Sequence, residues 1–125
     1  MADKTPVEKM QLKHGMKAAL LDVPDGMQKR LGLPADVIVV DDPATADFIL
    51  AFAMDQAEAE ERISALRPAI TGETVAWLAY PKGAKAAGRD ISRDTVWAFV
   101  QTIGMRLNAN VAVDDTWSAV RMRPA

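Results

Sequence analysis

The sequence predicts one α/β domain, with a mainly parallel β-sheet, helices packed on the sheet and an antiparallel hairpin at the C-terminal end. Short apolar runs alternate along the chain with patterns of helical period, which is the order of a sheet with crossover helices. The chain has 125 residues, half of them hydrophobic and 26% charged, which suits one globular domain. We therefore expect a single domain over residues 1–125, with residues 1–5 flexible.

The first helix is predicted from its capping residues. Thr5 can cap a helix whose first position is Pro6, and Glu8 completes a capping box. His14 and Gly15 are expected to end this helix within about three turns.

Four apolar runs are the predicted strands of the sheet. They have little polar alternation, so we expect both faces of each strand to be buried, as in parallel sheets. The runs cover residues 17–23, 37–40, 48–52 and 74–80. Only residues 41–47 join the second and third strands, too few for a crossover helix. Either this link is extended or the two strands are antiparallel, and the buried character of both runs favours the extended link.

Two helices are predicted between these strands. Asp25 can cap a short helix that ends at Gly32. Asp55 caps a longer helix, which Pro68 ends. The buried face of this second helix follows helical spacing and consists of Ala59, Ile63 and Leu66.

The C-terminal part of the chain reads as a helix and a hairpin. A helix begins at Ser92 and ends at Gly104, with a buried stripe of Val96, Phe99, Val100 and Ile103. Apolar residues on both sides of the turn 114–116 then predict an antiparallel hairpin. With right-handed crossovers, the predicted strand order is 2-1-3-4-6-5.

Composition excludes several classes of function. The chain has no cysteine and one histidine, so disulfides, cysteine catalysis and a transition-metal site are not expected. Its formal net charge is −2, which does not favour nucleic-acid binding. We find no signal peptide and no apolar run of the ~20 residues that span a bilayer. The expected location is the cytoplasm, without membrane contact.

Several segments carry a family resemblance. Residues 12–23 resemble the entry to the first strand of Rossmann-like methyltransferases. More closely, residues 24–26, 77–82 and 114–119 are similar to a small bacterial family of unknown function with a truncated, methyltransferase-like topology. The resemblance covers about residues 12–122 and implies a Rossmann-like fold without implying an activity. Methyltransferases carry a Gly-x-Gly-x-Gly-type loop after the first strand, whereas this chain has Val23-Pro24-Asp25-Gly26, in which the proline removes an amide donor.

Candidate ligand-binding residues follow the predicted strands at one edge of the sheet. In open α/β sheets, ligands bind at the carboxyl ends of strands, where the strand order reverses. The candidates are Pro24, Asp25, Gly26, Asp41, Asp42, Tyr80 and Lys82. The aspartates after the second strand could accept hydrogen bonds from ribose hydroxyls, and Lys82, Lys85 and Arg89 could meet an anionic group. The same residues also suit ordinary roles as turns, caps, a strand-end tyrosine and a solvated loop.

Three functions remain open at the sequence level. The favoured interpretation is a non-catalytic Rossmann-like module that acts by protein contacts or sensing, without a cofactor, in contact with a partner protein or a second copy of itself. The alternative is a small-molecule or nucleotide binder related to S-adenosylmethionine-dependent methyltransferases. An enzyme ranks last, because no acid–base or nucleophile motif stands out and no catalytic residue is predicted.

Overall fold

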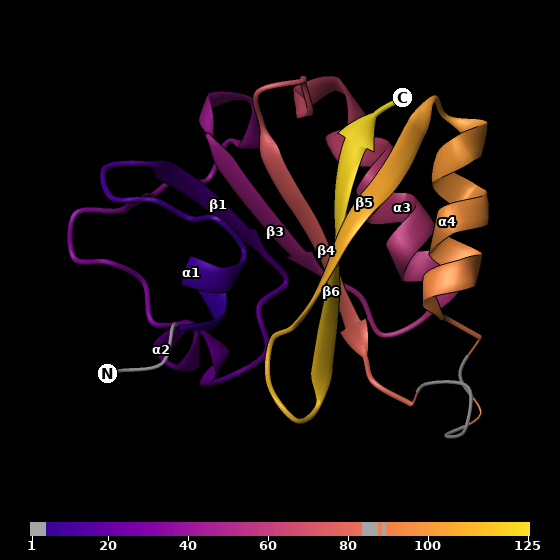
Figure 1. Ribbon diagram of the computed structural model, residues 1–125, viewed down its shortest axis with the longest axis horizontal. Helices are drawn as coiled ribbons and strands as arrows, with labels where there is room; N and C mark the ends of the chain where they lie inside the picture. The colour runs from indigo at the N-terminus through magenta and orange to yellow at the C-terminus, as the bar shows by residue number, and fades with distance from the viewer. Residues whose placement is uncertain (1–4, 84–87, 89) are drawn as a thin grey trace.

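The computed structural model, described for residues 5–83, 88 and 90–125, contains one six-stranded sheet with helices on both faces (Figure 1). The strands are β1 (Lys17–Leu21), β2 (Ile38–Val39), β3 (Phe48–Phe52), β4 (Val75–Pro81), β5 (Met105–Ala112) and β6 (Trp117–Pro124). The helices are α1 (Pro6–Lys9), α2 (Met27–Leu31), α3 (Gln56–Leu66) and α4 (Arg93–Thr102), with short 3₁₀ helices η1 (Pro43–Thr45) and η2 (Arg67–Ala69).

The strand order β2-β1-β3-β4-β6-β5 confirms the predicted topology. Both β2 and β3 run parallel to β1, because Ala18 is opposite Val39 on one side and opposite Phe48 on the other. The second and third strands are therefore parallel to each other, as predicted, but the link between them is not extended throughout, because it contains η1. β6 returns antiparallel beside β4, and β5 closes the sheet at its outer edge.

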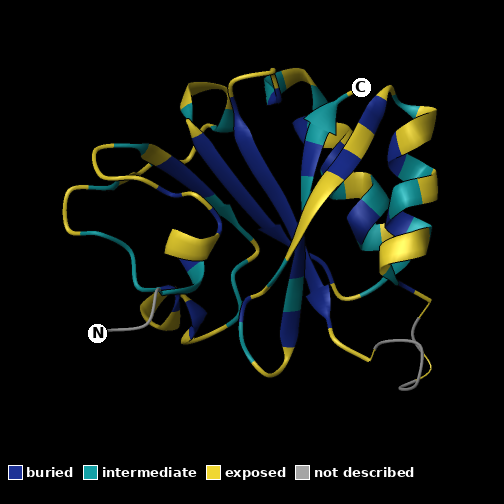
Figure 2. Ribbon diagram, in the orientation of Figure 1, coloured by how far each residue is buried: buried dark blue, intermediate teal, exposed yellow. Residues whose placement is uncertain are grey.

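Two hydrophobic clusters lie on opposite faces of the sheet, because successive strand residues point to opposite sides. Ile49 packs with Ile63 of α3 and Val100 of α4 in one cluster. Leu50 packs with Met10, directly after α1, and Met27 of α2 in the other. Figure 2 shows the buried strands in the centre of the molecule, between these two helical layers.

The two longer helices confirm their predicted caps, and α3 confirms its predicted buried face. Of the stripe predicted for α4, Val96 and Val100 are buried, whereas Phe99 and Ile103 are only partly buried. The Asp55 carboxylate accepts a hydrogen bond from the Glu58 backbone N–H at 2.9 Å, and Ile63 faces the core of the molecule. Ser92 caps α4 in a capping box with Thr95. Gly104 follows this helix with a left-handed φ of 75°, which glycine adopts without steric cost.

The prediction that the run 37–40 is buried on both faces is wrong. Only two residues form β2, and Ile38 and Val39 are 56% and 45% exposed. The two side chains point to opposite faces of the sheet. Val39, opposite Ala18, points to the face of α2, which has only five residues and packs in the cluster that holds Phe48 and Leu50. Ile38 points to the face of α3 and α4, whose buried residues pack in the cluster that holds Ile49. β-Branched residues thus favour a strand here without any helix covering the sheet edge.

The helices near the N-terminus also differ from prediction. α1 stops at Lys9, well before His14, and the indole N–H of Trp77 donates to the Met10 carbonyl at 2.9 Å. Thr5 and Glu8 form the predicted capping box, whereas residues 1–4, also predicted to be flexible, lie outside the described residues.

Asp25 does not cap α2, contrary to prediction. The N-cap is Gly26, which has a left-handed φ of 76° and leaves Asp25 in the preceding turn with no side-chain cap. A turn that needs positive φ at this point moves the helix start one residue further on. Gly32 ends the helix as predicted.

Candidate functional site

The candidate site is a crevice at the carboxyl ends of β1 and β3, where the strand order reverses. The chain leaves β1 and crosses to β2 on one side of it, and β3 then pairs with β1 on the opposite side. Because the two connections diverge at this point, a crevice forms at the carboxyl ends of β1 and β3. A cavity of about 410 Å³ lies there. We call it the β1/β3 crevice, and it is lined by Asp22, Pro24, Phe52, Ala53, Met54, Glu58, Arg62 and Trp117.

One wall of the crevice is aromatic and apolar. Phe52 ends β3, and Trp117 begins β6, so two distant parts of the chain contribute this wall. The two rings meet edge to face, with centroids 5.2 Å apart and an interplanar angle of 83°. Pro24 and Met54 add apolar surface. A flat apolar group of a ligand would find the contacts that aromatic side chains favour.

The other wall carries a linked set of charges. Arg62 of α3 donates through Nε to Asp22 Oδ2 at 2.5 Å and through Nη1 to Glu58 Oε1 at 3.0 Å. The Met54 backbone N–H also donates to Glu58 Oε1 at 3.2 Å. The hydrogen bond to Asp22, more than any other contact, raises the pKa of Arg62 above its ordinary value. Two carboxylates thus share one guanidinium, which leaves the wall with a net charge of about −1.

Asp22 has an unusual backbone conformation at this point. Its φ is 56°, in the left-handed region that non-glycine residues seldom occupy. Aspartate is one of the residues that tolerate this conformation best. The turn directs the carboxylate toward α3 as β1 ends, and backbone strain of this kind is concentrated at functional sites.

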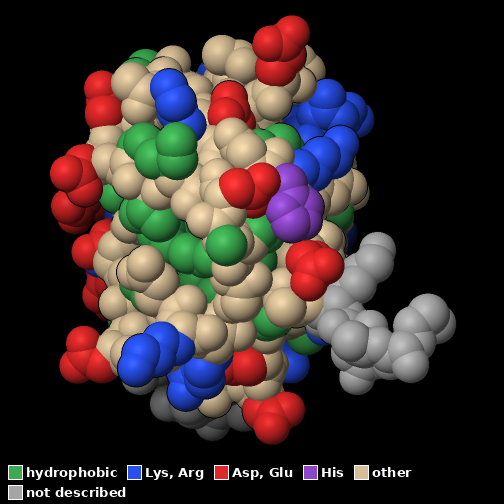
Figure 3. All heavy atoms as spheres, turned by 90° about the vertical axis from the view of Figure 1, so that its left-hand side faces the viewer, with side chains coloured by type: hydrophobic (Ala, Val, Ile, Leu, Met, Phe, Trp, Pro, Cys, Tyr) green, Lys and Arg blue, Asp and Glu red, His purple; other side chains and the backbone are tan. Residues whose placement is uncertain are grey.

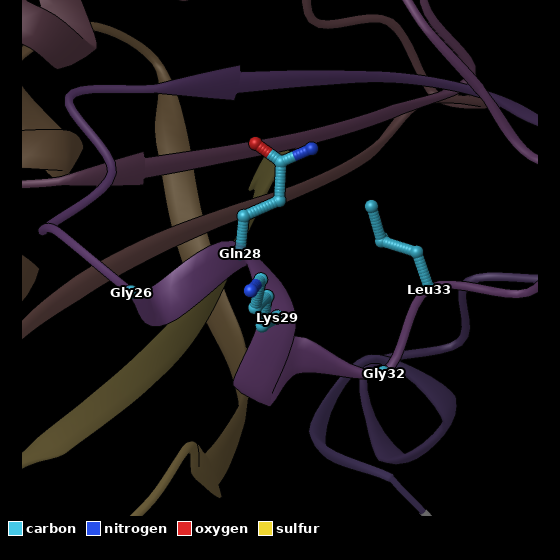
Figure 4. A pocket seen from close by; sticks show the side chains of 5 residues that line it. All are labelled: Gly26, Gln28, Lys29, Gly32 and Leu33. Atoms are coloured by element: carbon cyan, nitrogen blue, oxygen red, sulfur yellow. The ribbon is translucent and has the colours of Figure 1, made fainter.

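The predicted site residues are placed in different surroundings. Pro24 lines the β1/β3 crevice. Asp25 is exposed in the turn before α2. Gly26 borders a separate hollow of about 660 Å³ beside α2, where the side chains of Gln28 and Leu33 project to the same side (Figure 4). No aromatic or acidic side chain among the described residues lines this hollow, so its chemistry is less specific than that of the crevice.

The two aspartates after β2 lie outside the lining of the crevice. Asp42 caps η1, and its Oδ1 accepts from the Ala44 backbone N–H at 3.0 Å. Asp41 is exposed. This arrangement matches the turn-and-cap interpretation of the pair.

Tyr80 and Lys82 follow the course of β4 toward the hairpin. Tyr80 is 8% exposed and lies opposite Ser118 on β6. Burial raises the pKa of its hydroxyl, although the hydrogen bond to Ser118 and the charge of Arg93 act to lower it. Lys82 is exposed, and its backbone N–H donates to the Thr116 carbonyl at 2.7 Å. Lys85 and Arg89, the other predicted cations, lie outside the described residues.

Most of the crevice residues were not identified from the sequence. Asp22 was visible as a charge inside an apolar run, and Glu58 and Arg62 stand four residues apart on one helix, the spacing of an ion pair. Phe52 and Trp117 gave no signal, because an aromatic residue at a strand end is usually part of the core.

Comparisons with known proteins bear on the fold. No protein-family model and no curated protein sequence matches the chain. Among solved structures, the chain superposes on the tRNA methyltransferase TrmK of B. subtilis with a TM-score of 0.54 and 13% identity, over 100% of this chain and 67% of that one.

Two further solved structures share the arrangement of strands and helices. The PH0226 protein from Pyrococcus horikoshii has a TM-score of 0.59 and 9% identity, over 96% of this chain and 87% of that chain. LepI in complex with SAM has a TM-score of 0.54 and 14% identity, with 94% of this chain matching 38% of LepI. The fold is therefore Rossmann-like, of the kind found in methyltransferases, and at these identities the likeness concerns the fold alone.

Proposed function

We propose that this protein binds a small molecule of the S-adenosylmethionine or nucleoside class in the β1/β3 crevice. The observation that carries the proposal is the position of the crevice at the reversal of strand order, with aromatic and carboxylate side chains together in its lining. The complex of the similarly folded LepI with SAM supports the same ligand class.

The donor and acceptor groups of the crevice favour particular ligand features. Asp22 and Glu58 can accept hydrogen bonds from ligand hydroxyl or amino groups, and they favour a positive charge nearby. The edge-to-face pair of Phe52 and Trp117 offers a surface for a flat ring. Arg62 can turn part of its guanidinium toward a ligand carboxylate, because it has donors beyond those in its two ion pairs.

The turn after β1 argues against a pyrophosphate at the same place. Pro24 has no N–H, and the Met27 N–H already donates to the Pro24 carbonyl at 3.0 Å. Phosphate groups in such folds depend on free backbone N–H donors of a glycine-rich turn. The chain therefore suits a ligand held by side chains, such as S-adenosylmethionine, better than a dinucleotide.

A thermal-shift panel tests the proposal. It compares S-adenosylmethionine, S-adenosylhomocysteine, ATP, NAD and an acyl-CoA at concentrations far above the expected Kd. A ligand present at about 100 times its Kd should add about 2.7 kcal/mol to the free energy of unfolding. We expect this rise for the adenosyl sulfonium or thioether ligands, and a smaller one or none for NAD. An unchanged melting temperature with every ligand would contradict the proposal.

Protein contact, the function that the sequence favoured, stays a second candidate because of one feature of the surface. Ile38 and Val39 at the β2 edge are exposed hydrophobic side chains. Figure 3 looks onto this end of the molecule and shows hydrophobic side chains at its centre with acidic and basic ones around them. Sedimentation at increasing protein concentration tests self-association through this edge, with Val39→Lys as the variant that should abolish it.

A further inference from the structure

Three arginines gather on one face of the sheet, at the edge farthest from β2. Arg106 of β5 is directly opposite Arg123 of β6. Arg121 lies two residues before Arg123, so both point to the same face of the strand. Arg121 is also opposite Trp77 of β4, which places the cluster on the face of the sheet that carries α1 and α2. We call Arg106, Arg121 and Arg123 the arginine face.

The charges of the arginine face are not balanced within the described part of the chain. No ion pair joins any of the three guanidinium groups to a described carboxylate, and like charges directly opposite each other destabilise a sheet. Arg121 Nη1 donates to Gln11 Oε1 at 2.7 Å, but its Nε is buried without a hydrogen-bond partner among the described residues. Such a group needs a hydrogen-bond acceptor, and its positive charge favours an anionic one.

The same strands offer a free sheet edge. β5 is the last strand of the sheet and has eight residues, of which five are exposed: Arg106, Asn108, Ala109, Asn110 and Ala112. Figure 2 shows this exposed stretch along β5. A long exposed edge strand presents unpaired backbone N–H and C=O groups to any extended segment that approaches. Peptides bind in this way by adding a strand to the sheet.

The charge of the β5 edge distinguishes between the kinds of molecule that could bind there. A second copy of β5 would bring another arginine and no carboxylate, because the sequence of this strand is MRLNANVA. The chain has a net charge of −2, so it lacks the broad positive field that attracts nucleic acid. An acidic extended segment would pair with the free backbone groups of the β5 edge and would also balance the charges of the arginines.

We propose that the β5 edge binds an extended, acidic segment of a partner protein as an added strand, with its carboxylates on the arginine face. In such a segment, alternate residues would be acidic. The residues between them would lie beside Met105 and Leu107, which pack in the cluster on the other face. Recognition would therefore combine strand hydrogen bonds with charge-assisted bonds to arginine.

A binding experiment with defined peptides tests this proposal. The probe is a short capped peptide of alternating glutamate and valine, measured by fluorescence anisotropy at two salt concentrations. We expect binding that weakens as salt increases and hydrogen-exchange protection at Asn108, Ala109 and Asn110. Arg106→Glu should weaken binding about tenfold or more, whereas the matched charge reversal Lys17→Glu, on a distant strand, should leave it unchanged.

Two further ligands separate the alternatives. A peptide of alternating lysine and valine should not bind, and an oligouridylate should bind more weakly than the acidic peptide. The proposal is wrong if the acidic peptide does not bind, if Arg106→Glu and Lys17→Glu affect it equally, or if the oligouridylate binds more tightly. Melting curves of both variants serve as the control that each one folds.

Discussion

At the scale of single residues, Tyr80 gives a direct test of burial at the end of β4. It is the only tyrosine in the chain, and burial raises the pKa of its hydroxyl above the ordinary value of about 10. An ultraviolet absorbance titration should therefore give a midpoint above about 10. A midpoint at or below that value would mean that the hydroxyl is in contact with water.

The same pKa shift has a consequence for stability. The folded state holds the Tyr80 proton more tightly than the unfolded state, so the contribution of this group is complete below about pH 10. It is lost as the pH rises from there through the raised pKa of the folded state. The free energy of unfolding should thus fall more steeply with alkaline pH in the wild type than in Tyr80→Phe, measured by urea denaturation.

Asp22 allows charge and backbone strain to be separated. Its ion pair with Arg62 is partly exposed, so Asp22→Asn should cost only about 0–1 kcal/mol. Asp22→Ala loses the same charge and also places alanine at a φ of 56°, which costs about 1–2 kcal/mol more. Urea unfolding of both variants measures this difference. Equal losses would show that the left-handed conformation relaxes in the alanine variant.

The sequence predicts the role of a residue well where its own side chain determines the local structure, as in the caps formed by Asp55 and Ser92. It predicts the role less well where the backbone conformation depends on another part of the chain. Met10 accepts from the Trp77 indole, and Asp25 loses its expected cap because Gly26 adopts positive φ. Neither outcome can be recognised from neighbouring residues alone.

At the scale of elements, α3 is the helix that both packs against the sheet and supplies charge to the crevice. Ile63 is fully buried on it, so Ile63→Asp would place an unpaired carboxylate between helix and sheet and should cost about 3 kcal/mol or more. Ser64→Asp, on the exposed side of the same helix, should change stability by about 0.5 kcal/mol at most. Thermal melting of the pair checks the assigned face, and similar melting temperatures would refute it.

The hairpin formed by β5 and β6 contains a like-charge pair that a single substitution can relieve. Arg106→Glu would place a carboxylate opposite Arg123, and the opposite charges should raise stability by about 0.2–1 kcal/mol. Arg106→Lys keeps the like charges and should leave stability nearly unchanged. A melting temperature that falls in Arg106→Glu would show that Arg106 has a structural partner.

The elements differ in how far sequence patterns determine them. α3 and α4 carry both a cap and an apolar stripe, and both were predicted. The run 37–40 carried only β-branched composition, which predicts a strand but cannot predict whether a helix will cover it. Its exposure depends on where α2, α3 and α4 pack on the sheet, which is a property of other segments of the chain.

At the scale of the whole molecule, the topology followed from a few general rules. Buried runs, crossover handedness and the C-terminal hairpin define the strand order, and the order predicts a crevice between β1 and β3. The side chains that line the crevice depend on tertiary packing, since Trp117 reaches Phe52 from the far end of the chain. The sequence could therefore predict the position of this crevice but not most of the residues that line it. Among the described residues, no helix combines the length and the hydrophobicity needed to cross a bilayer.

The central claim is that the β1/β3 crevice binds a ligand of the adenosyl class, and an NMR amide-shift titration with S-adenosylhomocysteine tests it most directly. We predict saturable shifts at Asp22, Ala53 and Met54, together with the indole N–H of Trp117, all of which belong to the crevice lining. Asp22→Ala should weaken binding, whereas Asp41→Ala, which removes an exposed carboxylate outside the crevice, should not. Shifts confined to residues 26–33 beside α2, or no shifts at saturating ligand, would contradict the account.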